Sequence, residues 1–123
     1  MNNATNQLTV TVQGTDNQLW MTHQTLGASG WNSWLPKGAF TENTPHSAAC
    51  ANGNMVVSVI DGNGDPEFAK FDGFGNQQSG WVVASEFPIN LDSGIQLTAN
   101  GNNVYALADL DGSGGWRMIY ACN

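Results

Sequence analysis

A four-residue motif occurs twice in this chain, each time in the same setting. Ala51–Asn54 reads Ala-Asn-Gly-Asn and precedes an apolar run and an Asp-Gly pair, and Ala99–Asn102 repeats this arrangement later in the chain. A unit of this size cannot bury its own apolar face, so neighbouring units must stack to build a core. The chain is therefore expected to fold as stacked repeats, with any binding site multiplied along with them.

Short β-rich runs alternate with turn signals along the sequence, and no helical period is present, which predicts an all-β protein. Two Gly-Trp pairs, Gly30-Trp31 and Gly80-Trp81, are each expected to open a further strand. The other expected strands are Leu8–Val12, Gln18–Gln24, His46–Ala51, Met55–Ile60, Glu67–Phe71, Gly94–Ala99, Val104–Ala108 and Trp116–Ala121. Each full unit then holds four strands, A to D, and the chain reads B-C-D, A-B-C-D, A-B-C.

Four strands in roughly 40–50 residues are typical of a β-propeller blade. The chain is thus predicted to be one all-β domain, 1–123, with a partial blade at 1–44, a full blade at 45–92 and a partial blade at 93–123. A single ring needs roughly 4–8 blades, and about 2.5 are present. We therefore expect the ring to be completed by oligomerisation, as a dimer or a trimer, which would also cover open strand edges.

The charge balance excludes some partners. Three cations stand against ten carboxylates, for a net charge of −7, which opposes binding to a phosphate backbone, so no nucleic-acid partner is expected. No apolar run is long enough to insert into a membrane, and the first residues do not resemble a signal peptide. The expected location is the cytoplasm, or outside the cell by a route without a signal peptide. For Cys50 and Cys122, two free thiols are favoured over a disulfide because two cysteines form no framework pattern.

No motif for catalysis is present. The only histidines, His23 and His46, lie in no nucleophile–base or metal-protease pattern, and the carboxylates cluster in turns, where Asp is favoured for backbone reasons. The chain is expected not to be an enzyme.

One turn carries a metal signal. Asp61, Asn63 and Asp65 place oxygen-bearing side chains at alternate positions of a glycine-rich loop, a spacing that suits calcium. Asp and Asn also favour such turns because they bond to their own backbone and tolerate left-handed conformations. Both interpretations stay open, so no cofactor is required and Ca²⁺ is an option.

The aromatic residues are the main candidates for a binding site. Trp20 and Phe68 lie six residues after the turn glycines Gly14 and Gly62, and Trp116 lies two positions earlier in its own strand. Tryptophans repeated at this spacing can pack between blades, or can present a flat apolar face to a sugar ring beside polar turn residues. The predicted ligand-binding residues are Trp20, Trp31, Trp34, His23, Asp16, Trp81 and Trp116.

The segment Gln13–Trp20, which reads Gln-Gly-Thr-Asp-Asn-Gln-Leu-Trp, is followed by Gly30-Trp-Asn-Ser-Trp34. This pattern resembles the tectonin-like and Photorhabdus-type β-propeller lectins of bacteria and fungi. The resemblance implies four-stranded blades with glycan sites between neighbouring blades. It fades after residue 34: the second repeat keeps Gly80-Trp81 but has Ala84 where the second tryptophan would be. The Asp61–Asp65 turn is also similar, more loosely, to the calcium-binding repeats of integrin-like propellers.

Two functions follow as hypotheses. The first is a non-catalytic lectin in which repetition and assembly raise avidity for glycans. The second is a structural or protein-interaction propeller scaffold. The amide-rich surface and the tryptophans favour the lectin, since protein interfaces are enriched in arginine and the chain has only Arg117.

Overall fold

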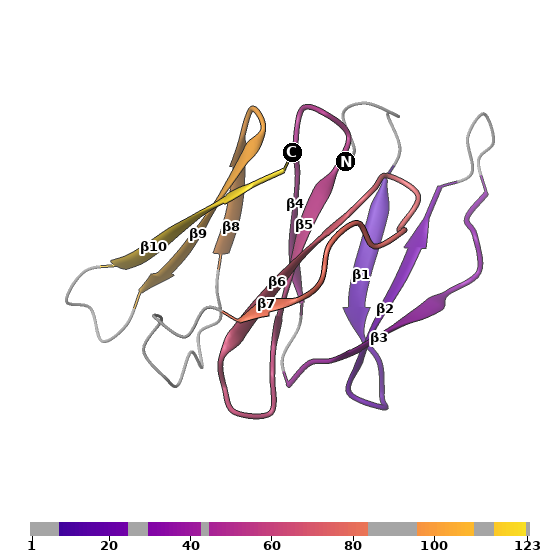
Figure 1. Cartoon of the computed structure of the whole chain (residues 1–123). Helices are drawn as coiled ribbons and strands as arrows, with labels where there is room; N and C mark the ends of the chain where they lie inside the picture. The colour runs from indigo at the N-terminus through magenta and orange to yellow at the C-terminus, as the bar shows by residue number, and fades with distance from the viewer. Residues whose placement is uncertain (1–7, 25–29, 43–44, 84–95, 110–114, 123) are drawn as a thin grey trace.

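The computed structural model describes residues 8–24, 30–42, 45–83, 96–109 and 115–122. All regular structure in this part of the chain is β-strand, which confirms the all-β prediction (Figure 1). None of the described residues forms a helix that could cross a membrane. The strands are β1 (Thr9–Gln13), β2 (Gln18–His23), β3 (Leu35–Phe40), β4 (His46–Ala49), β5 (Met55–Ile60), β6 (Pro66–Phe71), β7 (Val82–Val83), β8 (Gln96–Asn100), β9 (Asn103–Asp109) and β10 (Gly115–Ala121).

The strands form three antiparallel sheets in which strands consecutive in the sequence are neighbours. The first sheet has the order β1-β2-β3, the middle sheet β4-β5-β6-β7 and the third sheet β8-β9-β10. The strands therefore follow the predicted order B-C-D, A-B-C-D, A-B-C.

The two Gly-Trp pairs do not open strands as predicted. Trp31 makes only an isolated bridge with Gln24, and β3 begins at Leu35. In the middle sheet, β7 is limited to Val82–Val83 and begins after Trp81. The pairs mark connections that run back along the preceding strand, and the fourth strand starts only after them.

A five-residue loop joins the second and third strands of the repeat. In the loops 14–18 and 61–65, the N–H of the first residue donates to the carbonyl of the fifth, and the fourth residue is left-handed. Gly64 occupies that position with φ 82°, and Asn17 takes it in the first sheet with φ 59°. Glycine and asparagine tolerate this conformation best, so the two loops share one fold despite different sequences.

The strand register aligns the three sheets on this loop. The residue pairs that flank it are Gln13 with Leu19, Ile60 with Pro66, and Asp109 with Gly115, so five residues lie between the members of each pair. Each sheet has two faces. We call front face the one that carries the residues two and four positions before the loop, and back face the opposite one. Val10 and Val12 lie on the front face of the first sheet, and Val57 and Val59 on that of the middle sheet.

The core lies between the sheets. The back face of the first sheet, through Leu19 and Met21, packs on the front face of the middle sheet, and Phe71 is fully buried there. The back face of the middle sheet, through Val56 and Phe68, packs against the third sheet around Val104. Every residue of β5 is buried, because the middle sheet is covered on both faces.

The prediction of two free thiols is wrong, because Cys50 and Cys122 form a disulfide with Cα atoms 6.5 Å apart. The turn after β4 and the end of β10 meet when the third sheet stacks on the middle sheet. The two copies of the Ala-Asn-Gly-Asn motif touch at this point, where the N–H of Ala51 donates to the carbonyl of Gly101 at 2.9 Å. The side chain of Asn54 also donates to the Cys122 carbonyl at 3.0 Å.

Candidate functional site

Four of the five predicted binding residues of the first repeat, Asp16, Trp20, Trp31 and Trp34, gather on the front face of the first sheet. The register pairs Val12 with Trp20 and Val10 with Thr22, so these four side chains share one face. Leu19 and Met21 alternate with them along β2 and point into the core. This alternation follows from the two-residue period of a strand.

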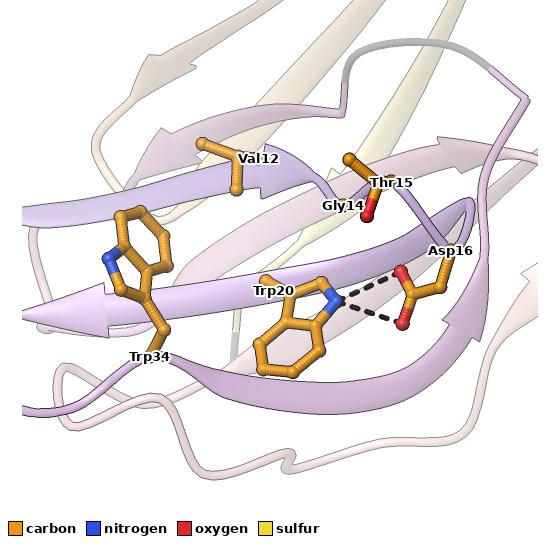
Figure 2. Close-up of a pocket in the computed structure, with 6 residues that line it drawn as sticks. All are labelled: Val12, Gly14, Thr15, Asp16, Trp20 and Trp34. Atoms are coloured by element: carbon orange, nitrogen blue, oxygen red, sulfur yellow. Dashed lines mark hydrogen bonds between the residues drawn. The ribbon is translucent and has the colours of Figure 1, made fainter.

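A first cavity of about 290 Å³ lies beside the β1–β2 loop. Figure 2 shows its lining residues: Val12, Gly14, Thr15, Asp16, Trp20 and Trp34. Trp20 comes from β2 and Trp34 from the segment before β3, so two indoles from separate parts of the chain flank one hollow.

The carboxylate of Asp16 holds the indole of Trp20. Trp20 Nε1 donates to Asp16 Oδ1 at 3.0 Å and lies 3.3 Å from Oδ2 (Figure 2). The backbone N–H of Gln18 also donates to Oδ1, at 3.1 Å. An ionised carboxylate has about four acceptor sites, so the exposed Asp16 can position Trp20 and still accept a hydroxyl from a ligand.

A second cavity of about 420 Å³ adjoins the first. Its lining residues are Val10, Thr22, Trp31, Asn32 and Trp34. Trp34 lines both cavities, and the side chains of Trp31 and Trp34 are 46% and 47% exposed. Two large apolar rings therefore remain open to solvent beside polar groups.

The backbone of Asn32 holds the segment that carries these two tryptophans. Its N–H donates to the His23 carbonyl at 2.9 Å, and its own carbonyl accepts from Thr22 Oγ1 at 2.6 Å. These bonds fix the segment over β2 without a continuous strand ladder. Nothing in the sequence pattern pointed to Thr22 or Asn32, because their role depends on the return of the chain across β2.

His23 supports the site from the side. Its Nε2 lies 2.6 Å from Asn32 Nδ2, and its ring meets Phe74 edge-on with centroids 6.1 Å apart. His23 lines neither of the two cavities. The register places it on the back face, opposite Thr9, so it contacts the binding segment only through Asn32.

Trp81 does not join these residues. Its half-buried side chain packs against the core, with its ring 6.0 Å from that of Phe71 at an interplanar angle of 62°. The side chain of Trp116 lies outside the described residues. The backbone of Trp116 pairs with Ala108 and stands two residues after its loop, in the same register position as Trp20. The predicted equivalence of Trp20 with Phe68 is therefore wrong, because the register gives that position to Glu67.

The turn with the calcium-like spacing is held by its own hydrogen bonds. Asp61 Oδ1 accepts the backbone N–H groups of Asn63 and Asp65, both at 2.9 Å. The turn-forming interpretation therefore accounts for Asp61. Within the described parts of the chain, no three histidine, cysteine or acidic side chains group in a way that could hold a metal. Burial raises the pKa of nearby Glu67, and the negative charge of Asp61 raises it further.

Comparison with known proteins assigns no family: no protein-family model matches the chain, and no curated protein matches it significantly.

Proposed function

We propose that this protein is a non-catalytic, carbohydrate-binding lectin whose site is the pair of cavities on the first sheet. The observation that carries the proposal is Trp34, which is half exposed and lines both cavities, beside Trp20 in the first and Trp31 in the second. The resemblance of residues 13–34 to β-propeller lectins supports the same function.

The chemistry of the cavities suits a neutral sugar. The C–H face of a pyranose ring can pack on an exposed indole, while hydroxyls bond to a few placed polar groups. Asp16 offers acceptors in the first cavity, and Asn32 and Thr22 offer polar groups in the second. The carboxylate and the net charge of −7 disfavour acidic glycans by like-charge repulsion.

Further features of the proposal concern assembly and location. The three stacked antiparallel sheets support their assignment as propeller blades, with a ring completed by copies of the chain as a dimer or a trimer. Such a ring would raise avidity by repeating the site. The disulfide supports an oxidising compartment, where such bonds persist.

A binding experiment tests the function. A glycan array, repeated with calcium and with a chelator, would identify a neutral ligand, and titration would then compare Trp34→Ala with the parent. Trp side chains bury about 150–250 Å², so a sugar covering half of the exposed part of Trp34 removes about 50 Å² from water. At about 25 cal/mol/Å² this gives about 1.2 kcal/mol, or an eightfold rise in Kd.

Phe40→Ala is the matched control, because Phe40 is 46% exposed and lines neither cavity. Its Kd should equal that of the parent. No binding to any neutral glycan, with or without calcium, would refute the lectin proposal. Binding that is lost equally in both variants would place the site elsewhere.

A further inference from the structure

We infer that the front face of the first sheet docks the back face of the third sheet of a second copy of this chain. The inference rests on the assembly proposed above, and its test does not require glycan binding. It follows from the way the three sheets stack within one chain.

The sheets stack in one direction. The back face of the first sheet covers the front face of the middle sheet, and the back face of the middle sheet covers the front face of the third. Two faces are not covered by another sheet in the described parts of the chain, the front of the first sheet and the back of the third. A back face packs on the next front face twice within the chain. The back face of the third sheet is therefore expected to fit the front face of the first sheet of another copy.

Exposure at register-equivalent positions shows that the described residues leave the β1 side of the front face of the first sheet uncovered. Leu8 lies opposite Gln24, as Met55 lies opposite Phe71 and Val104 opposite Tyr120. Met55 and Val104 are 3% and 1% exposed because a neighbouring sheet covers them, whereas Leu8 is 37% exposed.

The next front-face position along β1 repeats the contrast. Val10 is 36% exposed, and its equivalent Val57 is fully buried. Removing aliphatic surface from water is favourable, so both residues would gain from a covering sheet.

The back face of the third sheet offers the matching surface. Thr98 pairs with Tyr105 across β8 and β9, so both lie opposite the face of Leu97 and Val104, which packs inward. Tyr105 is only half-buried, whereas its register equivalent in the middle sheet, Val56, is fully buried.

The glycan cavities lie beside the docking surface. The segment of Trp31 to Trp34 already covers the β2 side of the front face, where Thr22 is 5% exposed. The part left open is the β1 side around Leu8, and Val10, which also lines the second cavity, lies where the docking surface and the glycan site meet. Leu8 lines neither cavity, so assembly can be altered there without touching the glycan site.

A complementation experiment tests the pairing of faces. Leu8→Lys alters only the docking face and Tyr105→Lys only the opposite face. Thr98→Arg is a second variant on the third sheet, and Val10→Lys, whose side chain also lines the second cavity, is a second variant on the first sheet. Val82→Lys, on an exposed position of β7, is the control. Circular dichroism checks that each variant folds, and light scattering gives its mass against 13.1 kDa for one chain.

Two different faces that meet head to tail generate a ring when the rotation between copies closes and an open filament when it does not. The parent and Val82→Lys should form one closed species, as the ring proposed above requires. Each docking variant should be a monomer, and an equimolar mixture of Leu8→Lys with Tyr105→Lys should give dimers and nothing larger, since one intact face remains on each chain. A monomeric parent would overturn the inference. So would an assembly broken by Leu8→Lys but not by the third-sheet variants, because the front face would then pair with itself.

Discussion

Reduction of the disulfide should remove a large part of the stability of this protein. Cys50 and Cys122 are both fully buried and are separated by 72 residues. Breaking the bond frees the unfolded chain, and it also requires the two buried sulfur atoms to move apart within the core. For a loop of this length the chain-entropy relation gives about 4.4 kcal/mol at 25 °C. Small domains have about 5–15 kcal/mol in total, so the loss is substantial.

Urea unfolding with and without a thiol reductant measures this effect. With slopes of about 1–3 kcal/mol/M, the midpoint should fall by about 1.5–4 M when the protein is reduced. The double variant Cys50→Ser/Cys122→Ser should unfold at the same midpoint with and without reductant, which controls for other effects of the reagent. Hydrogen exchange should quicken first at the N–H of Cys122, which donates to the Asn102 carbonyl. A change of less than 1 kcal/mol on reduction would refute the reasoning.

Two further variants test the site and the charge of the middle sheet. A Cβ on Gly14 would lie 2.5 Å from both Asp16 Oδ1 and Trp20 Nε1, so Gly14→Ala should displace the indole and raise the glycan Kd at least about fivefold, or about 1 kcal/mol. Gly30→Ala, where a Cβ meets open space, should leave the Kd unchanged, and equal effects of the two changes would contradict this role of Asp16. The pKa of Glu67 is raised in the folded state, so the folded protein binds the Glu67 proton more tightly than the unfolded chain does. The free energy of unfolding therefore includes a full contribution from this proton below about pH 4.3 and loses it as pH rises through the folded pKa. Glu67→Gln should therefore raise the free energy of unfolding at pH 7 and not at pH 3.5, with Glu42→Gln as the exposed control; a gain that is the same at both pH values would argue against burial of the charge.

The strand order could be predicted because its signals are local. Apolar runs such as Met55–Ile60 and turn residues such as Gly64 specify strands and hairpins without knowledge of distant contacts. The alignment of the repeats by their turn glycines was wrong in the loop between the second and third strands, where the glycines do not occupy equivalent positions. Counting from Gly14 and Gly62 shifts the alignment by one residue, because Gly14 is the first residue of its loop and Gly62 is the second. The equivalent left-handed positions are held by Asn17 and Gly64, which differ in residue type.

The contacts between sheets could not be predicted from local pattern. Trp31 and Trp81 each follow a glycine in the sequence, yet the side chain of Trp31 is open to solvent and that of Trp81 packs on Phe71. The difference depends on which face a neighbouring sheet covers. The pairing of Cys50 with Cys122 depends in the same way on the stacking of the third sheet.

Leu8→Lys also separates the affinity of one site from the avidity of the assembly. Both cavities are lined by residues of a single chain, and Leu8 is not among them. A monomeric Leu8→Lys protein should therefore bind a free glycan with a Kd within about twofold of the parent. Its apparent affinity for a densely glycan-coated surface should fall by about 10²-fold or more, because linked sites gain avidity only when several engage at once.

Titration with free sugar and surface binding on the same two proteins measure both quantities, and Val82→Lys should match the parent in each. An equal loss of free-sugar and surface binding would mean that the cavities are completed by the back face of a second copy. The tryptophans on the first sheet would then be one wall of a site shared between two chains. Retention of free-sugar binding would instead place the whole site on the first sheet of one chain. Assembly would then only increase the number of sites in the oligomer.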